Sequence, residues 1–184
     1  MIDTVTKGQA AQPEPWLRGT LADVPAVIRA VLHALELARE DAERWCGDLM
    51  GVEVNAQPAG LPSAAFQLRH IAGSVDRLLT YAEGSDLSEA QLVALARETE
   101  GGSLPHLLLQ DFGGSMERAD QRVRGFVGAD LESHRVVGRR RLPTTLGGLL
   151  VHIAEHTQRH VGQMITTAKI VKATRNAITS SESR

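Results

Sequence analysis

Three histidines recur at intervals of four residues in the segment 151–164, VHIAEHTQRHVGQM, as His152, His156 and His160. In a helix, a step of four residues advances about 40° around the axis, so the three imidazoles would share one stripe. Two histidines one turn apart can both reach one metal ion through neutral ring nitrogens. A third protein ligand from elsewhere in the chain would leave an open coordination position, as catalytic metal sites do.

The rest of the chain must supply the helices that position this stripe, and its apolar pattern predicts them. Ser63 opens one apolar run, and Ser88 is the predicted cap of a short helix over 88–100. Residues 128–143 are basic and punctuated by glycines, which predicts an irregular connection with short extended pieces. Apolar residues recur near helical spacing in four long segments, over residues 23–49, 64–83, 104–127 and 144–173. Together these features predict an all-α four-helix bundle, with a short extra helix and an irregular connection before the last helix.

The chain of 184 residues is long enough for one domain with a real core. Aromatic residues make up only 3% of it, so the core must consist mainly of Leu, Ala, Val and Ile, which favours helices packed on helices. We predict a mobile N-terminal segment over 1–20, a helical bundle domain over 21–173 and a polar C-terminal tail over 174–184.

Composition also disfavours several classes of partner. The formal net charge of −2 gives no electrostatic reason to expect nucleic acid or an anionic membrane surface. No window approaches the ~20 consecutive apolar residues that a membrane span needs. The single cysteine, Cys46, excludes an intramolecular disulfide, and the first residues do not resemble a secretory signal. We therefore expect a cytoplasmic protein with no nucleic acid and no membrane as partner, in which Cys46 packs as a small apolar residue.

The third ligand of a metal site is best sought on the second long helix, where His70 borders the apolar face. Helices two and four of a bundle can face each other and supply ligands to one internal site, so His70, His156 and His160 form a natural three-histidine set. The alternative is that each histidine only makes a hydrogen bond on a partly buried face. His152 would be a fourth ligand, a neighbour that shuttles protons, or more simply a buried or surface histidine. His33 on the first helix is a weaker candidate for the site.

Two other charged residues follow His70 on the same predicted helix. Asp76 and Arg77 lie six and seven residues after it, so they could contact a substrate or form ion pairs within the bundle. Pairing within the bundle is the favoured role for both.

Two motifs of the chain resemble a known family. HTQRHVGQ, residues 156–163, resembles the H-x-x-x-H-x-G-Q ending of the DinB/YfiT family of metal-dependent enzymes, and LRHIAGSVDRLLTY, residues 68–81, resembles the helix that completes the metal site there. The resemblance extends over about residues 21–171, and it concerns the order of the helices as well as the residues of the motifs. It implies that His70, His156 and His160 are the metal ligands, with water in the open positions. Val161 departs from the family pattern, which often has Arg there.

The resemblance also implies a range of chemistry. A divalent metal on three neutral histidines keeps its full charge, so it can lower the pKa of a bound water or activate a thiolate. Relatives include transferases and isomerases that use bacillithiol or mycothiol, and they often form dimers. The predicted function is therefore a metal-dependent enzyme for thiol transfer, with hydrolysis second, acting on a small-molecule substrate with a low-molecular-weight thiol as its partner and forming a homodimer. Zinc, nickel and iron all suit imidazole ligands.

Two other functions stay open at this point, and no catalytic residue is identified beyond the ligands. One is a non-catalytic helical bundle with a structural or vestigial metal site, which acts as a binding or stress-associated protein. The other is a plain helical domain whose histidines only satisfy local hydrogen bonds.

Overall fold

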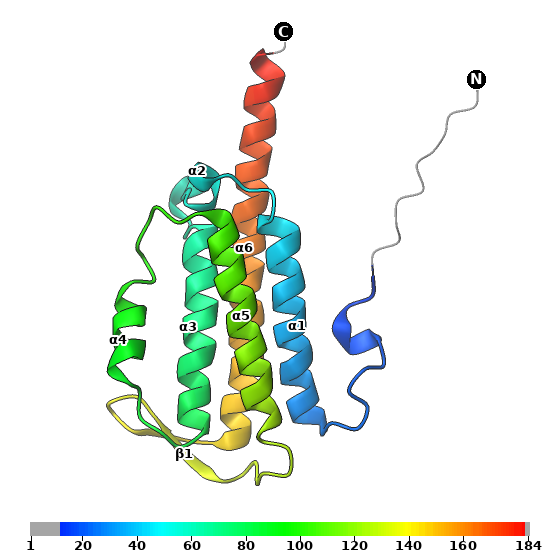
Figure 1. Cartoon of the computed structure of the whole chain (residues 1–184), viewed down its shortest axis with the longest axis vertical. Coiled ribbons are helices and arrows are strands. Elements are labelled where there is room, and N and C mark those ends of the chain that lie inside the picture. The colour runs from blue at the N-terminus through cyan, green and yellow to red at the C-terminus, as the bar shows by residue number, and fades with distance from the viewer. Residues whose placement is uncertain (1–11, 183–184) are drawn as a thin grey trace, which may run out of the picture.

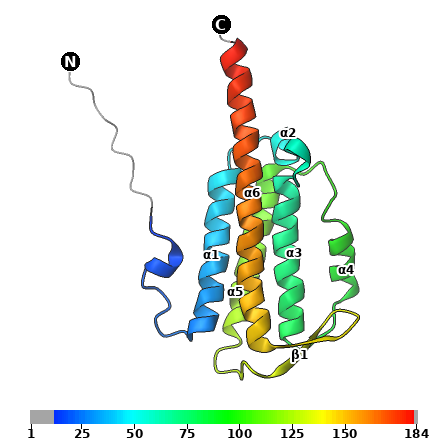
Figure 2. The same ribbon diagram turned by 180° about the vertical axis from the view of Figure 1, so that it is seen from behind.

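The computed structural model describes residues 12–182, and four long helices dominate it (Figure 1). They are α1 (Ala26–Cys46), α3 (Ala64–Ala82), α5 (Pro105–Arg124) and α6 (Leu146–Glu182). Helix α6 lies between α1 and α3 on one side of the bundle, as Figure 2 shows, and α5 packs on α1 and α3 from the other side. The predicted all-α bundle is confirmed.

Shorter elements join the long helices. They are η1 (Pro15–Leu17), α2 (Gly51–Val54), η2 (Pro58–Gly60), α4 (Glu89–Ala96), β1 (His134–Val137) and β2 (Leu142–Thr145). The two strands pair antiparallel, with Arg135 opposite Thr144, so the predicted irregular connection contains a small hairpin before α6. Helix α4 is the predicted short extra helix, and it lies to one side of the bundle (Figure 1).

Serine and threonine side chains fix where three of the helices begin. The hydroxyl of Ser63 accepts a hydrogen bond from Phe66 N at 3.1 Å, which caps α3. Ser88 caps α4 in the same way through Gln91 N, and the Gln91 side chain accepts the Ser88 N–H in return, which completes a capping box. Thr145 accepts from Gly148 N at 3.1 Å at the start of α6. Each capping oxygen satisfies an N–H that the helix itself leaves without a partner.

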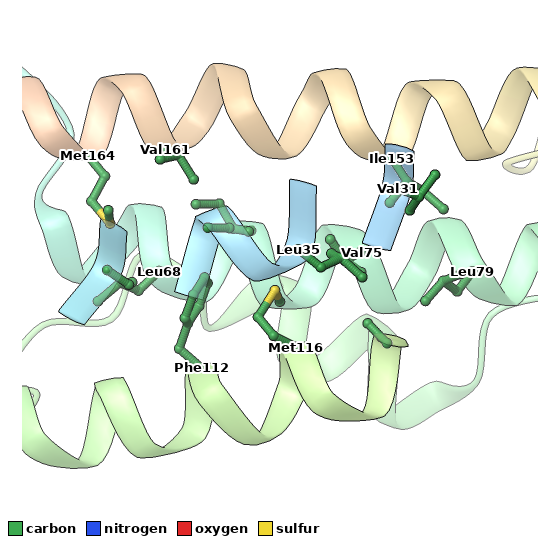
Figure 3. Close-up of a cluster of buried hydrophobic side chains, with 14 of the residues drawn as sticks. Val31, Leu35, Leu68, Val75, Leu79, Phe112, Met116, Ile153, Val161 and Met164 are labelled. Carbon is green, nitrogen blue, oxygen red and sulfur yellow. The ribbon is translucent and has the colours of Figure 1, made fainter. Parts of the chain in front are cut away.

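The core runs along the axis of the bundle, where the apolar stripes of the four long helices meet (Figure 3). Aliphatic side chains make up most of it, as the low aromatic content predicted, and Phe112 is its largest fully buried side chain. Two polar side chains of this region, Gln67 and Thr157, are also fully buried. The histidine cluster lies beside this core, on α3 and α6.

The end of α6 differs from the sequence prediction. The polar residues after Ala173 were expected to fray, but α6 continues to Glu182 and projects beyond the other helices (Figure 1); residues 183–184 lie outside the described part. Arg175 gives the physical reason, because its guanidinium donates to Asp48 at 3.0 Å and to Glu53 at 3.3 Å. These contacts tie the first turn of the predicted tail to the α1–α2 connection.

The end of the N-terminal segment contacts the bundle in the part that can be described. Of the segment 1–20, which was predicted to be mobile, residues 1–11 lie outside the described residues. Arg18 makes hydrogen bonds to Glu36 at 3.0 Å and to both carboxylate oxygens of Glu40 at 2.6 and 2.7 Å. Both acids belong to α1, so this two-pronged contact fixes η1 against the bundle. None of the helices within 12–182 is long and apolar enough to cross a membrane.

Candidate metal centre

Three of the seven histidines meet between α3 and α6. His70 comes from α3, and His156 and His160 come from successive turns of α6. The ring centroid of His70 lies 5.3 Å from that of His156 and 4.3 Å from that of His160, and the two α6 rings are 4.5 Å apart. One nitrogen from each ring lies within 4.8 Å of the other two, so the group could hold one metal ion. The structure thus brings together the three predicted ligands.

A buried carboxylate orients His70. Glu98, in the connection after α4, is only 5% exposed, and its Oε2 lies 2.8 Å from Nδ1 of His70. Its other oxygen accepts from Arg77 Nη1 at 2.7 Å. Burial raises the pKa of the Glu98 carboxyl, but the hydrogen bonds from His70 and Arg77 outweigh it, so the pKa lies below its usual value. A charged carboxylate on Nδ1 leaves Nε2 of His70 as the ligand atom and makes it more basic.

A glycine makes room for this carboxylate. A Cβ on Gly73 would lie 2.7 Å from Nη1 of Arg77 and 2.8 Å from Oε1 of Glu98. Contacts of that length do not occur, so any side chain at this position would push the ion pair away from α3. Gly73 therefore allows the ion pair between Glu98 and Arg77 to lie close to the backbone of α3.

An amide chain orients His160. Its Nδ1 lies 2.8 Å from Oε1 of Gln67, and the Gln67 amide nitrogen donates to Oε1 of Gln163 at 3.0 Å. Because Gln67 uses its nitrogen toward Gln163, its oxygen must accept the proton of Nδ1 of His160. The lone pair of Nε2 is then free for a metal. Gln163, the last residue of the HTQRHVGQ motif, thus belongs to this chain of amides.

His156 is held more loosely. Its Nδ1 lies 3.4 Å from the hydroxyl of Ser74, which is buried. Burial lowers the pKa of His156, and the neighbouring His160 and His70 add to this shift, so that the pKa lies at about 4. Burial also lowers the pKa of His160, again with help from His70. Both rings are therefore neutral near pH 7, which is the form that binds a metal.

The fourth histidine of the region points elsewhere. The side chain of His152 is 44% exposed, and its Nδ1 lies 3.0 Å from Glu155 Oε1. Its ring centroid is 5.4 Å from that of His156, but it does not belong to the group whose nitrogens converge. Within residues 12–182, the converging set is therefore three imidazoles without a fourth side-chain ligand. Such a set suits zinc, nickel or iron and leaves coordination positions for water or substrate.

The weaker sequence candidates lie outside the cluster. His33 is buried on α1, and its Nε2 is 3.2 Å from the hydroxyl of Thr20. Asp76 pairs with Arg122 at 2.6 Å, so it makes contacts within the bundle as predicted. Cys46 is completely buried, and burial raises the pKa of its thiol to about 12, so it packs as a small apolar residue.

A comparison with known protein families agrees with this geometry. The family model of the DinB superfamily matches residues 34–164, which is more than half of the chain and includes all three converging histidines. The chain belongs to the DinB superfamily. None of the curated proteins matches it significantly. The likeness to the DinB/YfiT family that the two motifs indicated is thereby confirmed.

Sequence reasoning missed several residues of this DinB site. Glu98 lies 28 positions from His70, in a segment without any motif, and nothing in the local pattern links the two. Gln67 and Ser74 flank His70 on the same helix, three positions before it and four after it. Both spacings place a polar side chain on the His70 side of α3, and that signal could have identified them.

Proposed function

We propose that this member of the DinB superfamily is a metal-dependent enzyme that uses one divalent ion on His70, His156 and His160, with thiol transfer favoured over hydrolysis. One observation carries the proposal. One nitrogen from each of the three imidazoles lies within 4.8 Å of the other two, while Nδ1 of each ring contacts Glu98, Ser74 or Gln67, which leaves Nε2 of each ring for a metal. Structural zinc sites have four protein ligands, whereas catalytic sites keep a position open.

The chain's own residues hold this ligand set in place. Glu98 and Gln67 fix two of the rings and keep their Nδ1 atoms protonated, and burial keeps His156 neutral. A divalent ion bound there would supply Lewis acidity, which lowers the pKa of a bound water or stabilises a thiolate. A low-molecular-weight thiol is the co-substrate that this chemistry favours.

A second candidate is a non-catalytic bundle with a structural metal site. The observation that favours it is that the acid nearest to the cluster is fully engaged. Both oxygens of Glu98 accept hydrogen bonds, from His70 and from Arg77, so this carboxylate is held in an orienting role instead of standing free as a general base at the metal. If the protein is nevertheless an enzyme, the metal alone must activate the substrate.

Elemental analysis tests the metal site first. The protein purified without an affinity tag, after growth with zinc, nickel and iron, is expected to carry about one metal per chain. The His156→Ala variant should lose it, because two histidines hold such an ion weakly. His152→Ala is the matched control on the same helix and should keep the metal, since His152 points to Glu155. Metal-free wild-type protein under these conditions would contradict the proposal.

An activity assay then separates the two candidates. The metal-loaded protein is mixed with a small thiol and an electrophilic acceptor, and thiol consumption is followed with and without a chelator. Faster transfer that disappears with the chelator and in His156→Ala supports the enzyme. A fully loaded protein that neither transfers thiols nor hydrolyses ester and amide substrates would support the non-catalytic bundle.

A further inference from the structure

A cavity lies on α3, on a different face of the helix from His70. It has a volume of about 680 Å³ and is bounded by α3, α4 and α5. Sites for small molecules commonly have volumes of about 300–1,000 Å³. Its apolar lining comes from all three helices and includes Leu68, Ala72, Val93, Ala94, Leu108 and Phe112.

The cavity is separate from the metal centre. Arg69, Ala72, Gly73 and Asp76 line it, and their spacing of three, four and seven residues places them on one face of α3. His70 is turned about 100° from Arg69 around the helix, toward α6. The ion pair between Glu98 and Arg77 lies between the two sites. The inference below therefore goes beyond the proposed function and does not depend on it.

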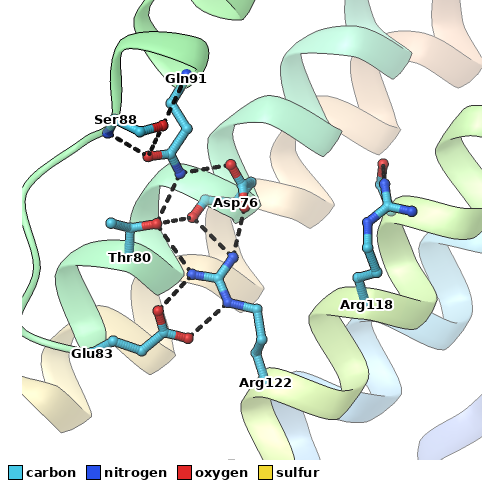
Figure 4. A network of polar contacts seen from close by, with 8 residues as sticks. Asp76, Thr80, Glu83, Ser88, Gln91, Arg118 and Arg122 are labelled. Carbon is cyan, nitrogen blue, oxygen red and sulfur yellow. Dashed lines mark hydrogen bonds and ion pairs between the residues drawn. The ribbon is translucent and has the colours of Figure 1, made fainter.

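Helix α4 covers the cavity without packing tightly on the bundle. None of its residues is buried, and its apolar side chains Leu92, Val93 and Leu95 are between 42% and 46% exposed. Its first turn is attached to α3, where the Gln91 amide donates to Asp76 at 2.6 Å and to Thr80 at 2.8 Å (Figure 4). Polar contacts at its ends, rather than an apolar interface, thus hold this helix over the cavity.

Most charges in the lining are paired. Arg122 pairs with Asp76 at 2.6 Å and with Glu83 at 2.7 Å. The Glu98 carboxylate pairs with Arg77, and the Glu100 carboxylate lies 3.7 Å from Arg97. These pairs leave little net charge on the lining.

Three charged groups of the lining lack an ion-pair partner among residues 12–182. Arg118 donates only to the hydroxyl of Ser115, at 2.9 Å, and Figure 4 shows it apart from the network around Arg122. Arg69 donates to the backbone carbonyl of Glu100, and Asp111 of the lining forms no ion pair with a residue of the described part. The lining carries four arginines and four acids and so has no net charge, but within residues 12–182 two of its guanidinium groups and only one of its carboxylates lack an ion-pair partner.

We propose that this cavity binds a small amphipathic carboxylate, with its anionic group on Arg118 and its apolar part on Ala72, Ala94 and Phe112. A guanidinium can bind a carboxylate through two parallel hydrogen bonds, and Arg118 lacks such a partner among the described residues. The apolar lining would exclude water from the rest of the ligand.

Octanoate, a carboxylate on an apolar chain, is the probe. Full-length, metal-loaded protein labelled with ¹⁵N is titrated with it, and the backbone amide shifts are followed by NMR. Shifts are expected in the lining segments of α3, α4 and α5, with saturation. Octanamide has the same chain without the charge, so it should bind about tenfold more weakly or worse.

Variants identify the anchoring residue. Arg118→Gln should weaken octanoate binding by about tenfold or more while leaving octanamide binding unchanged, and Arg118→Lys should recover part of the loss. Arg39→Gln is the matched control, because Arg39 is an exposed arginine on α1 that pairs with Glu117 at 3.5 Å; this variant should bind octanoate like the wild type. The proposal is overturned by an absence of shifts up to millimolar octanoate, by equal affinity of Arg118→Gln, or by shifts confined to the histidine cluster.

Discussion

At the scale of single residues, the three histidines differ in what holds Nδ1. His70 has a buried carboxylate, His160 has the oxygen of a buried amide, and His156 has a hydroxyl at 3.4 Å. The carboxylate is the strongest of these partners, because a charged acceptor both orients the ring and raises the basicity of Nε2. Glu98 is thus the residue outside the ligand set with the largest expected effect on metal affinity.

The Glu98→Gln variant tests this role. Its amide keeps the shape of the side chain but removes the charge, so metal affinity should fall by about 10–100-fold. Glu100→Gln is the control, because Glu100 is exposed and its carboxylate contacts only Arg97. Competition with a chromophoric chelator measures both affinities, and equal affinity of Glu98→Gln and wild type would show that Glu98 acts only in folding.

The low pKa of His156 predicts how stability depends on pH in the metal-free protein. Its pKa is about 4 in the folded state and about 6.5 in the unfolded chain, so only the unfolded chain takes up the proton between these values. Stability should therefore be complete above about pH 6.5 and fall as the pH drops toward 4. The loss between pH 7 and pH 5 should be about 1 kcal/mol, after allowance for partial solvent exposure.

Urea unfolding at pH 7 and pH 5, with a chelator present, measures this loss. His156→Gln should show a smaller loss, since glutamine does not titrate. His106→Gln replaces an exposed histidine at the start of α5 and should follow the wild type. A loss as large in His156→Gln as in the wild type would assign the effect to other groups.

At the scale of elements, α3 and α4 differ in how many of their side chains are buried. Helix α3 buries nine side chains and contributes to both the core and the metal centre, whereas α4 buries none. Elements with few buried contacts open locally at a smaller free-energy cost than the whole protein. Helix α4 should therefore open independently of the bundle.

Two cap substitutions test this difference. Ser63→Ala removes the cap of α3 and should lower the free energy of unfolding by about 1 kcal/mol. Ser88→Ala removes the cap of α4 and should speed hydrogen exchange of the α4 amides, with little change in global unfolding. Urea unfolding and exchange mass spectrometry measure the two effects, and equal losses of global stability would mean that α4 unfolds with the core.

At the scale of the whole molecule, the four long helices enclose an aliphatic core with one unsatisfied polar atom. Thr157 on α6 is fully buried, and within the described part of the chain its hydroxyl has no hydrogen-bond partner. Thr167, ten residues further along α6, is also buried, but its hydroxyl donates to the carbonyl of Pro62 at 3.0 Å. The two threonines are a matched pair for measuring the cost of burying a hydroxyl.

Substitution by valine, which has the same shape, should act in opposite directions at these sites. Thr157→Val should stabilise the protein by about 1 kcal/mol, because it removes a buried group without a partner. Thr167→Val should destabilise it by a similar amount, because it leaves the Pro62 carbonyl unpaired. Thermal or urea unfolding of the metal-free variants measures both, and a destabilised Thr157→Val would indicate that a water bonds to this hydroxyl.

The sequence alone determined the features that depend on neighbours along the chain. The bundle, the starts of α3 and α4 at Ser63 and Ser88, and the pair His156 and His160 all follow from helical periodicity and capping, which are local. His70 could be added because a bundle brings its second and fourth helices together. The predicted end near Ala173 was wrong because Arg175 contacts Asp48 and Glu53, which are far away in sequence.

Only the tertiary structure decided which groups surround the histidines. It placed Glu98 on His70 across 28 residues, and it turned His152 toward Glu155, although its spacing is the same as that of the two converging histidines. It also left Arg118 without an acidic partner, as far as residues 12–182 show, in a cavity beneath α4. Spacing fixes the face of a helix on which a side chain lies, but the packing of other elements against that face decides what the side chain contacts.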